Sequence, residues 1–132
     1  MKNIILNLLF TFCFSIIFGQ SSDRTYLGHY HNYGTAYSYG VTEIIIHSDS
    51  TYTWKSWSVN NKKEWKTYKK RKPEVSNGKI TRNGKFYTLT QYRNGNKTDF
   101  NWTAKIHDKQ LNFYYPKRNG KLKKSFKYKR IN

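Results

Sequence analysis

The sequence has 132 residues, a single Cys and a formal net charge of +18 at pH 7, from 25 Lys and Arg against 7 Asp and Glu. This length suits one domain. One Cys excludes an intramolecular disulfide, and the excess of positive charge favours anionic partners over cationic ones.

The first 19 residues have the layout of a secretory signal peptide. Lys2 supplies a positive charge, the apolar run from Ile4 to Phe18 covers 15 residues, and Gly19 offers a small residue for cleavage. The run is shorter than the roughly 20 residues that a membrane-spanning helix needs. We therefore predict a signal peptide at 1–19, an exported protein that is periplasmic or secreted, and one mature domain at 20–132. An uncleaved membrane anchor is the alternative.

Removing these 19 residues leaves 113, and because only Lys2 is lost, 24 basic and 7 acidic residues remain, a net charge of +17. Cys13 is lost as well, which excludes a thiol nucleophile and a cysteine metal site in the mature chain. Its twelve Tyr, four Trp and four Phe outnumber Val, Ile and Leu together. Such rings suit the face of a sheet, so we predict an aromatic core. No other apolar run in the chain approaches the length of the first one, so no transmembrane segment is predicted in the mature chain.

Along the mature chain, side chains alternate between apolar and polar as they do on strands. Strands are predicted at 25–31, 41–47, 51–59, 79–81, 85–92, 99–106, 111–115 and 122–129. Asn-Gly pairs at 77–78, 83–84 and 94–95 are predicted to form turns. The segment 60–72 fits either one helical turn, with Trp65 and Tyr68 on one side, or a strand, and Pro73 ends both.

The alternation is clearest in the last third of the chain. Its apolar positions, which are expected to face the core, are Phe100, Trp102, Ala104, Ile106, Leu111, Phe113, Tyr115, Leu122, Phe126 and Tyr128. On the last strand, Lys123, Lys127 and Lys129 are expected to project from one outer face about 7 Å apart. The whole pattern predicts an all-β fold, an antiparallel up-and-down meander of about eight or nine strands closed into a barrel, with a β-sandwich as the alternative.

Three short segments resemble the small lipocalin-like barrels of exported bacterial proteins. They are Gly28-His29-Tyr30, Asp49-Ser50-Thr51-Tyr52, and Gly78-Lys79-Ile80 leading to Phe86-Tyr87-Thr88-Leu89. Lipocalins carry a Gly-x-Trp on the first strand, covered by an Arg from the last strand. The resemblance implies that Tyr30 takes the place of that Trp and Arg130 that of the Arg. It also implies a ligand cavity or a closed core, without catalysis.

Two basic clusters give the main functional hypothesis. The residues predicted to bind a polyanion are Lys69, Lys70, Arg71, Lys72, Lys123, Lys127, Lys129 and Arg130. Phosphates, sulfates or uronates can bridge rows of cations, and aromatic neighbours can stack on bases or sugars. We therefore expect a non-enzymatic binding module that contacts an acidic glycan, lipopolysaccharide or nucleic acid, as a free polymer or as a membrane surface. The competing interpretation is a solvated outer face.

Two further hypotheses follow from the same residues. One is a carrier of a small apolar ligand, held inside the barrel by Tyr30, Trp54, Trp102 and Phe113. The other is a hydrolase or metal-dependent enzyme. Its only handle is the pair His29 and His31, which share a face of a predicted strand and would need further ligands from His47, His107 and Glu43. The catalytic motifs of hydrolases and phosphate-binding loops are missing, so no catalytic residue, metal or cofactor is predicted, and the oligomeric state stays open.

Overall fold

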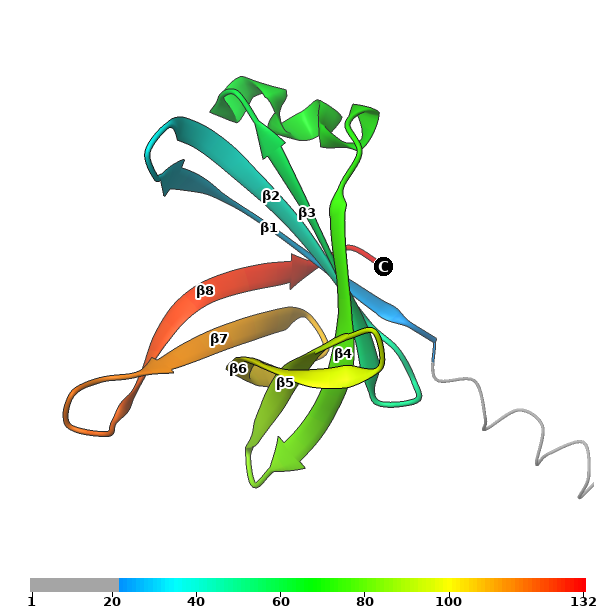
Figure 1. The fold of residues 1–132 in the computed structure, drawn as a ribbon, viewed down its shortest axis with the longest axis vertical. Coiled ribbons are helices and arrows are strands. Elements are labelled where there is room, and N and C mark those ends of the chain that lie inside the picture. The colour runs from blue at the N-terminus through cyan, green and yellow to red at the C-terminus, as the bar shows by residue number, and fades with distance from the viewer. Residues whose placement is uncertain (1–21) are drawn as a thin grey trace, which may run out of the picture.

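Alternating side chains and short turns close the chain into an eight-stranded antiparallel barrel, in a computed structural model that describes residues 22–132 (Figure 1). Each strand pairs with the next in the sequence, and the last pairs back to the first. The predicted up-and-down barrel is confirmed, with eight strands, and replaces the β-sandwich alternative. The elements are β1 (Arg24–Tyr33), β2 (Tyr37–Ile46), β3 (Thr51–Val59), η1 (Lys62–Lys70), β4 (Glu74–Asn83), β5 (Phe86–Arg93), β6 (Asn96–Ile106), β7 (Gln110–Pro116) and β8 (Leu122–Arg130).

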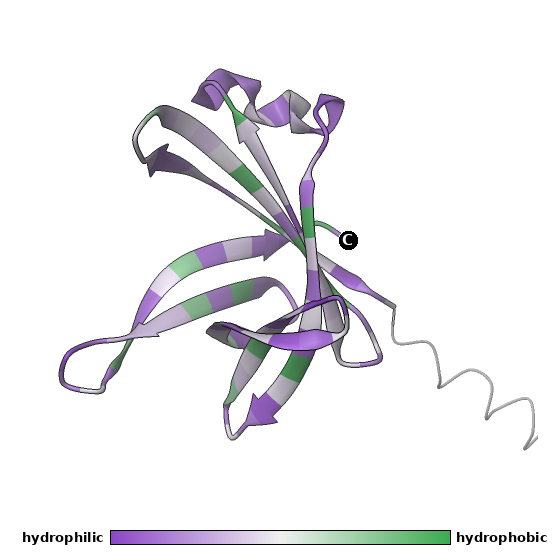
Figure 2. Cartoon of the chain, viewed as in Figure 1, coloured by the Kyte–Doolittle hydropathy of each residue, from purple (hydrophilic) through white to green (hydrophobic). Residues whose placement is uncertain are grey.

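Hydrophobic residues form bands mostly on the strands, whereas hydrophilic residues predominate on η1 and at the tips of the β5–β6 and β7–β8 hairpins (Figure 2). Within residues 22–132, no helix has both the length and the apolar character to cross a membrane. The predicted signal peptide lies outside the described residues.

One of the Asn-Gly pairs forms a turn, whereas another lies inside a strand. Asn94 and Gly95 form the β5–β6 turn with φ angles of 51° and 79°, as predicted. Asn77 and Gly78 instead lie inside β4, so the turn predicted there is wrong. A Cβ atom at Gly78 would come within 2.5 Å of the Tyr52 ring, so the glycine is needed for close packing inside the barrel.

The barrel interior is packed by rings that lie directly over strand glycines. A Cβ atom at Gly28 would lie 1.5 Å from Tyr128 Cδ1, and one at Gly40 would lie 2.7 Å from Tyr30 Cε2. Glycines therefore give the large rings room against the backbone. The buried residues of this inner core are Tyr26, Ile44, Ile46, Tyr52, Leu89, Ala104, Leu111, Phe113 and Tyr128.

A second core lies on the outer face of the barrel, beneath η1. Of the two alternatives for residues 60–72, the helical one is confirmed: η1 is 3₁₀ helix with a kink at Thr67, and Trp65 and Tyr68 both pack against this second core. Tyr68 meets the Trp57 ring edge-on, with 4.8 Å between centroids. Its hydroxyl donates a hydrogen bond to Glu43, a carboxylate on β2 that is only 6% exposed. This contact fastens η1 to the sheet.

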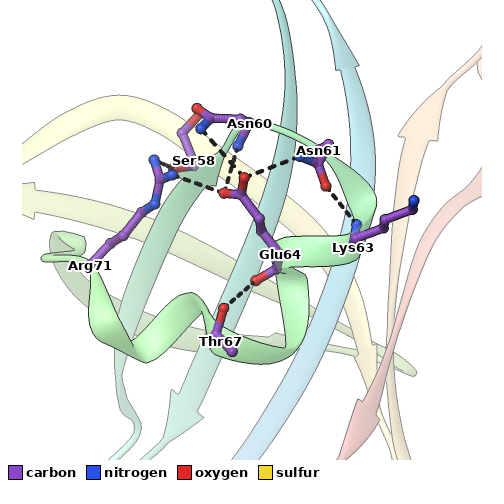
Figure 3. A network of polar contacts seen from close by, with 7 residues as sticks. All are labelled: Ser58, Asn60, Asn61, Lys63, Glu64, Thr67 and Arg71. Carbon is purple, nitrogen blue, oxygen red and sulfur yellow. Dashed lines mark hydrogen bonds and ion pairs between the residues drawn. The ribbon is translucent and has the colours of Figure 1, made fainter.

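The start of η1 is held by a polar network drawn in Figure 3. Asn61 caps the helix by accepting a hydrogen bond from the Lys63 amide at 2.9 Å. The Glu64 carboxylate accepts hydrogen bonds from Asn60 and Asn61 and pairs with Arg71 at 2.9 Å. The network joins both ends of η1, which fixes its position over the sheet.

The barrel is closed by a short seam. β1 and β8 pair only at Tyr26 with Arg130 and at Leu27 with Lys129. Beyond these pairs, the β1–β2 and β7–β8 hairpins spread apart (Figure 1). The barrel is therefore tightly closed near the start of β1 and open at the opposite end.

The regular alternation on β8 is interrupted by a β-bulge. β7 and β8 pair at Asn112 with Lys127 and then at Tyr114 with Lys124, so β8 has one more residue than β7 between these pairs. Because directly opposite residues share a face, the bulge places Lys124 on the face of Lys127, whereas Lys123 pairs with Tyr115 on the other face. The predicted row of Lys123, Lys127 and Lys129 on one face is therefore wrong.

Candidate functional site

The open end of the barrel contains a hollow of about 260 Å³ lined almost entirely by aromatic rings. The structure brings together around it all four residues predicted from the sequence to border a cavity. That they hold a ligand stays a prediction. The full lining is Tyr30, Trp54, Trp102, Phe113, Tyr114, Tyr115, Ser125, Phe126 and Tyr128.

The floor of this aromatic hollow is made by rings from opposite walls of the barrel. Trp54 on β3 stacks on Trp102 of β6, with centroids 5.0 Å apart and planes at 30°. β3 and β6 are not neighbours in the sheet, so this contact crosses the interior. Trp54 Nε1 donates a hydrogen bond to Ser56 Oγ at 2.9 Å, which satisfies its polar group and fixes the ring.

Two further hollows, both more polar, adjoin the aromatic hollow. One, of about 490 Å³, shares Tyr30, Trp54 and Trp102 with it and adds Glu74 and Arg93. The other, of about 590 Å³, also includes Tyr30 and Glu74. Volumes of this size suit small-molecule ligands. The open end therefore combines an apolar centre with a polar, charged margin.

Several apolar side chains expected to face the core are exposed at this end instead. Phe100 is 62% exposed, Phe126 52%, Tyr115 44% and Leu122 40%. Tyr115, Leu122 and Phe126 belong to the β7–β8 hairpin, which has spread away from the β1–β2 hairpin (Figure 1), so no opposite wall covers them. Phe100 lies on β6 outside the part of that strand that pairs with β7. Phe100 and Phe126 nevertheless border the hollows, and Phe126 lies 5.7 Å from the Tyr30 ring.

Part of the first predicted polyanion cluster is engaged in structural contacts. Lys69 Nζ lies 3.4 Å from Glu43 Oε1, and Arg71 pairs with Glu64. Arg71 also donates to the Ser58 carbonyl, so it holds η1 in place. Lys70 and Lys72 are exposed on the surface.

The second cluster is split by the bulge and by an ion pair. Lys127 and Lys129 border a surface depression of about 690 Å³ at the closed end, together with Lys109 and Arg130. Lys123 lies on the other face of β8. The Arg130 guanidinium is paired with Asp108, which partly compensates its charge. The depression therefore gathers only three of the eight residues predicted to bind a polyanion, Lys127, Lys129 and Arg130.

Arg130 does not cover Tyr30, as the resemblance to lipocalins implied. It pairs across the seam with Tyr26, four residues along β1 from Tyr30, and its guanidinium bonds to Asp108 and the Asn132 carbonyl. The ring that packs near Tyr30 is Phe126. The Tyr26 hydroxyl also donates a 2.7 Å hydrogen bond to the His107 carbonyl, near Asp108 at the closed end of the barrel.

A row of aromatic and histidine rings on the outer face of the β1–β2 hairpin was missed by the sequence analysis. We call it the outer ring stripe, and it comprises Trp65, His29, Tyr39, His31, Tyr33 and Tyr37. The spacing of His29, His31 and Tyr33 on every second residue of a strand was a usable signal. Trp65 could not be found in this way, because only the fold of η1 brings it to His29.

The histidines do not form a metal site. His29 Nδ1 and His31 Nδ1 share hydrogen bonds with the Tyr39 and Tyr37 hydroxyls, at 2.5 and 3.0 Å. His47 instead shares hydrogen bonds with the side chains of Asp23 and Thr53. Within residues 22–132, no group of three or more His, Cys, Asp or Glu could hold a metal ion. Within the described part of the chain, His47, His107 and Glu43 therefore do not gather around His29 and His31, and the enzyme hypothesis stays a prediction.

The fold defines an all-β barrel with an open, aromatic end. No protein-family model, curated protein or solved structure matches the chain.

Proposed function

We propose that the chain is an exported, non-enzymatic binding module that holds a small apolar ligand at the open end of its barrel, in the manner of lipocalins. One observation carries this proposal: Tyr30, Trp54, Trp102 and Phe113, from four different strands, line one hollow. Its lining includes no charged residue. Transfer of apolar surface from water to such rings favours binding by about 25 cal/mol per Å² buried.

The proposal predicts binding of a neutral apolar dye. We expect the fluorescence of N-phenyl-1-naphthylamine to rise when it enters the aromatic hollow. Ser125 lines this hollow and is exposed, so Ser125→Trp should fill the space without disturbing the core. The dye's affinity should fall about tenfold or more, because the loss of apolar contacts worth ~1.4 kcal/mol gives that factor. Fluorescence titration measures the change.

Ser48→Trp is the matched control, since Ser48 is exposed in the β2–β3 turn, away from the hollow. It should bind the dye as the unmodified protein does. Equal affinity in both variants, or no dye binding by the unmodified protein, would contradict the proposed site.

A second candidate function is association with an anionic polymer or surface. The observation that favours it is the depression lined by Lys109, Lys127, Lys129 and Arg130. Among the Lys and Arg side chains of residues 22–132, only Lys69, Arg71 and Arg130 form ion pairs with carboxylates, so most of the positive charge is uncompensated. Such a surface attracts polyanions strongly at low ionic strength.

Heparin chromatography tests this second function. We expect retention that salt reverses, and earlier elution of the double variant Lys127→Gln/Lys129→Gln. The control removes the same charge from the β7–β8 loop, as Lys117→Gln/Lys121→Gln, and should elute later than the first variant. Identical elution of both variants would show that net charge alone, and no particular site, causes retention.

A further inference from the structure

The outer ring stripe exposes aromatic surface that the fold does not use. Tyr33 is 79% exposed and Tyr37 50%, although both are large rings on paired strands. They lie directly opposite each other, 5.9 Å apart. Contiguous exposed rings on a small barrel indicate a surface for a partner, since single exposed apolar residues are common but clusters are not.

The rings of the stripe are held in place before any partner binds. Trp65 stacks on His29 with centroids 4.2 Å apart and planes at 14°, and η1 fixes the position of Trp65. His31 stacks on Tyr33 at 15° and meets Tyr39 edge-on at 84°. Because these side chains are already ordered, a flat ligand that stacks on them loses little conformational entropy of the protein.

Cations border the stripe. Lys129 is paired with Leu27, two residues before His29 on the same outer face of β1. Lys62 lies three residues before Trp65, which is one turn of η1. Burial, followed by the positive charges of Lys62 and Lys129, lowers the pKa of His29. Lys129 also lines the basic depression, so the stripe and the depression adjoin each other.

Carboxylates near the stripe are already occupied. Glu43 binds the Tyr68 hydroxyl and Lys69, and Glu64 binds Arg71 and the Asn60 and Asn61 side chains. The surface therefore offers flat rings and positive charge without an acceptor carboxylate for sugar hydroxyls. This chemistry favours a ligand that combines planar unsaturated rings with a repeating anion.

We infer that the outer ring stripe binds single-stranded nucleic acid that runs along it, with bases stacked on Tyr33 and Tyr37 at one end and phosphates of further nucleotides near Lys62 and Lys129 at the Trp65–His29 end. The inference rests on the second candidate function and gives it a site and a class of polymer. On β1, His29, His31 and Tyr33 succeed one another about 7 Å apart, from the two-residue repeat of a strand. Such a row can engage successive unpaired bases, whereas the bases of a duplex are stacked on each other and present no free ring face.

The test compares two polyanions, a fluorescently labelled oligothymidylate and dextran sulfate, which has charge but no bases. Tyr33→Ala/Tyr37→Ala should weaken oligothymidylate binding about tenfold or more in fluorescence anisotropy, because each stacked base contributes binding energy. Dextran sulfate binding should be unchanged. The control is Phe86→Ala, which removes a ring beside Lys105 and outside the stripe, and should leave oligothymidylate binding unchanged.

A second variant tests the electrostatic half of the site. Lys62→Gln/Lys129→Gln should flatten the dependence of log K on log salt by about 1.4 for oligothymidylate, because each of the two lost phosphate contacts removes about 0.7 from the slope. Lys117→Gln/Lys121→Gln should change the slope less.

The outcomes separate the inference from the function on which it rests. If Tyr33→Ala/Tyr37→Ala weakens the binding of oligothymidylate and of dextran sulfate equally, base stacking is overturned and an acidic glycan is indicated as the ligand. If both polymers bind and no stripe variant changes their affinity, the stripe is not the site, whereas the second candidate function is still supported. Failure of the unmodified protein to bind either polymer would overturn both.

Discussion

Gly28→Ala is expected to lower the free energy of unfolding by about 3 kcal/mol or more, the upper range for overpacking a well-packed core. The new Cβ atom would lie 1.5 Å from Tyr128 Cδ1, inside the ring's own volume. Tyr128 is only 4% exposed and packs against Phe113 and Trp54, so it cannot move away without displacing them. Urea denaturation followed by circular dichroism measures the loss.

Gly34→Ala is the matched control. Gly34 lies between β1 and β2, and the nearest heavy atom to its new Cβ would be Asn32 Oδ1 at 4.0 Å. The same substitution there should change stability by less than about 1 kcal/mol. Equal stability of the two variants would contradict the ring-over-glycine packing of Gly28 and Tyr128.

Raising the pH above 10 is expected to unfold the protein, because its core contains buried phenols. Burial raises the pKa of Tyr52 from 10.0 to about 12, and it raises the pKa values of Tyr26, Tyr68 and Tyr128 as well. In the unfolded chain these groups ionise near pH 10, whereas in the barrel they stay neutral. Their ionisation therefore leaves the free energy of unfolding unchanged below pH 10 and lowers it as the pH rises from 10 through the folded pKa values, by about 3 kcal/mol for Tyr52.

Tyr52→Phe separates this effect from the deprotonation of lysines, which occurs in every variant. The Tyr52 hydroxyl is buried without a hydrogen-bond partner. Its removal should stabilise the protein by about 1 kcal/mol at pH 7 and shift alkaline unfolding to higher pH. The comparison requires urea titrations at pH 7 and 11. A variant that is less stable than the unmodified protein at both pH values would show that the hydroxyl has an unrecognised partner.

The barrel itself was predictable because its information is local. Alternation predicted the strands of the last third with ends within about three residues of the observed ones, and Asn94-Gly95 predicted a turn through the positive φ that both residues tolerate. The predictions failed where a local signal had a non-local cause. Gly78 is needed by the Tyr52 ring from the neighbouring strand, and no pattern within β4 reveals that contact.

The same distinction applies to the candidate sites. Tyr30, Trp54, Trp102 and Phe113 were found because each occupies an inward position of an alternating strand, and closure of the sheet alone brings such positions together. The basic row on β8 failed because one extra residue reverses the phase of alternation after the bulge.

Ion pairing was a second non-local cause. The contacts of Arg71 with Glu64 and of Arg130 with Asp108 join residues whose side chains meet only in the folded chain. Charge counted along the sequence therefore overestimates the charge available to a polyanion.

The narrow closure between β1 and β8 sets the order in which the molecule can be completed. Both of its residue pairs, and the backbone bond from the Ile131 amide to the Thr25 carbonyl, join the first strand to the last residues of the chain. β1 therefore finds its second neighbour only through residues about a hundred positions further along the sequence. Contacts of such long sequence separation cost the most loop-closure entropy, so we expect the β1–β8 seam to form late in folding, after the hairpins between consecutive strands.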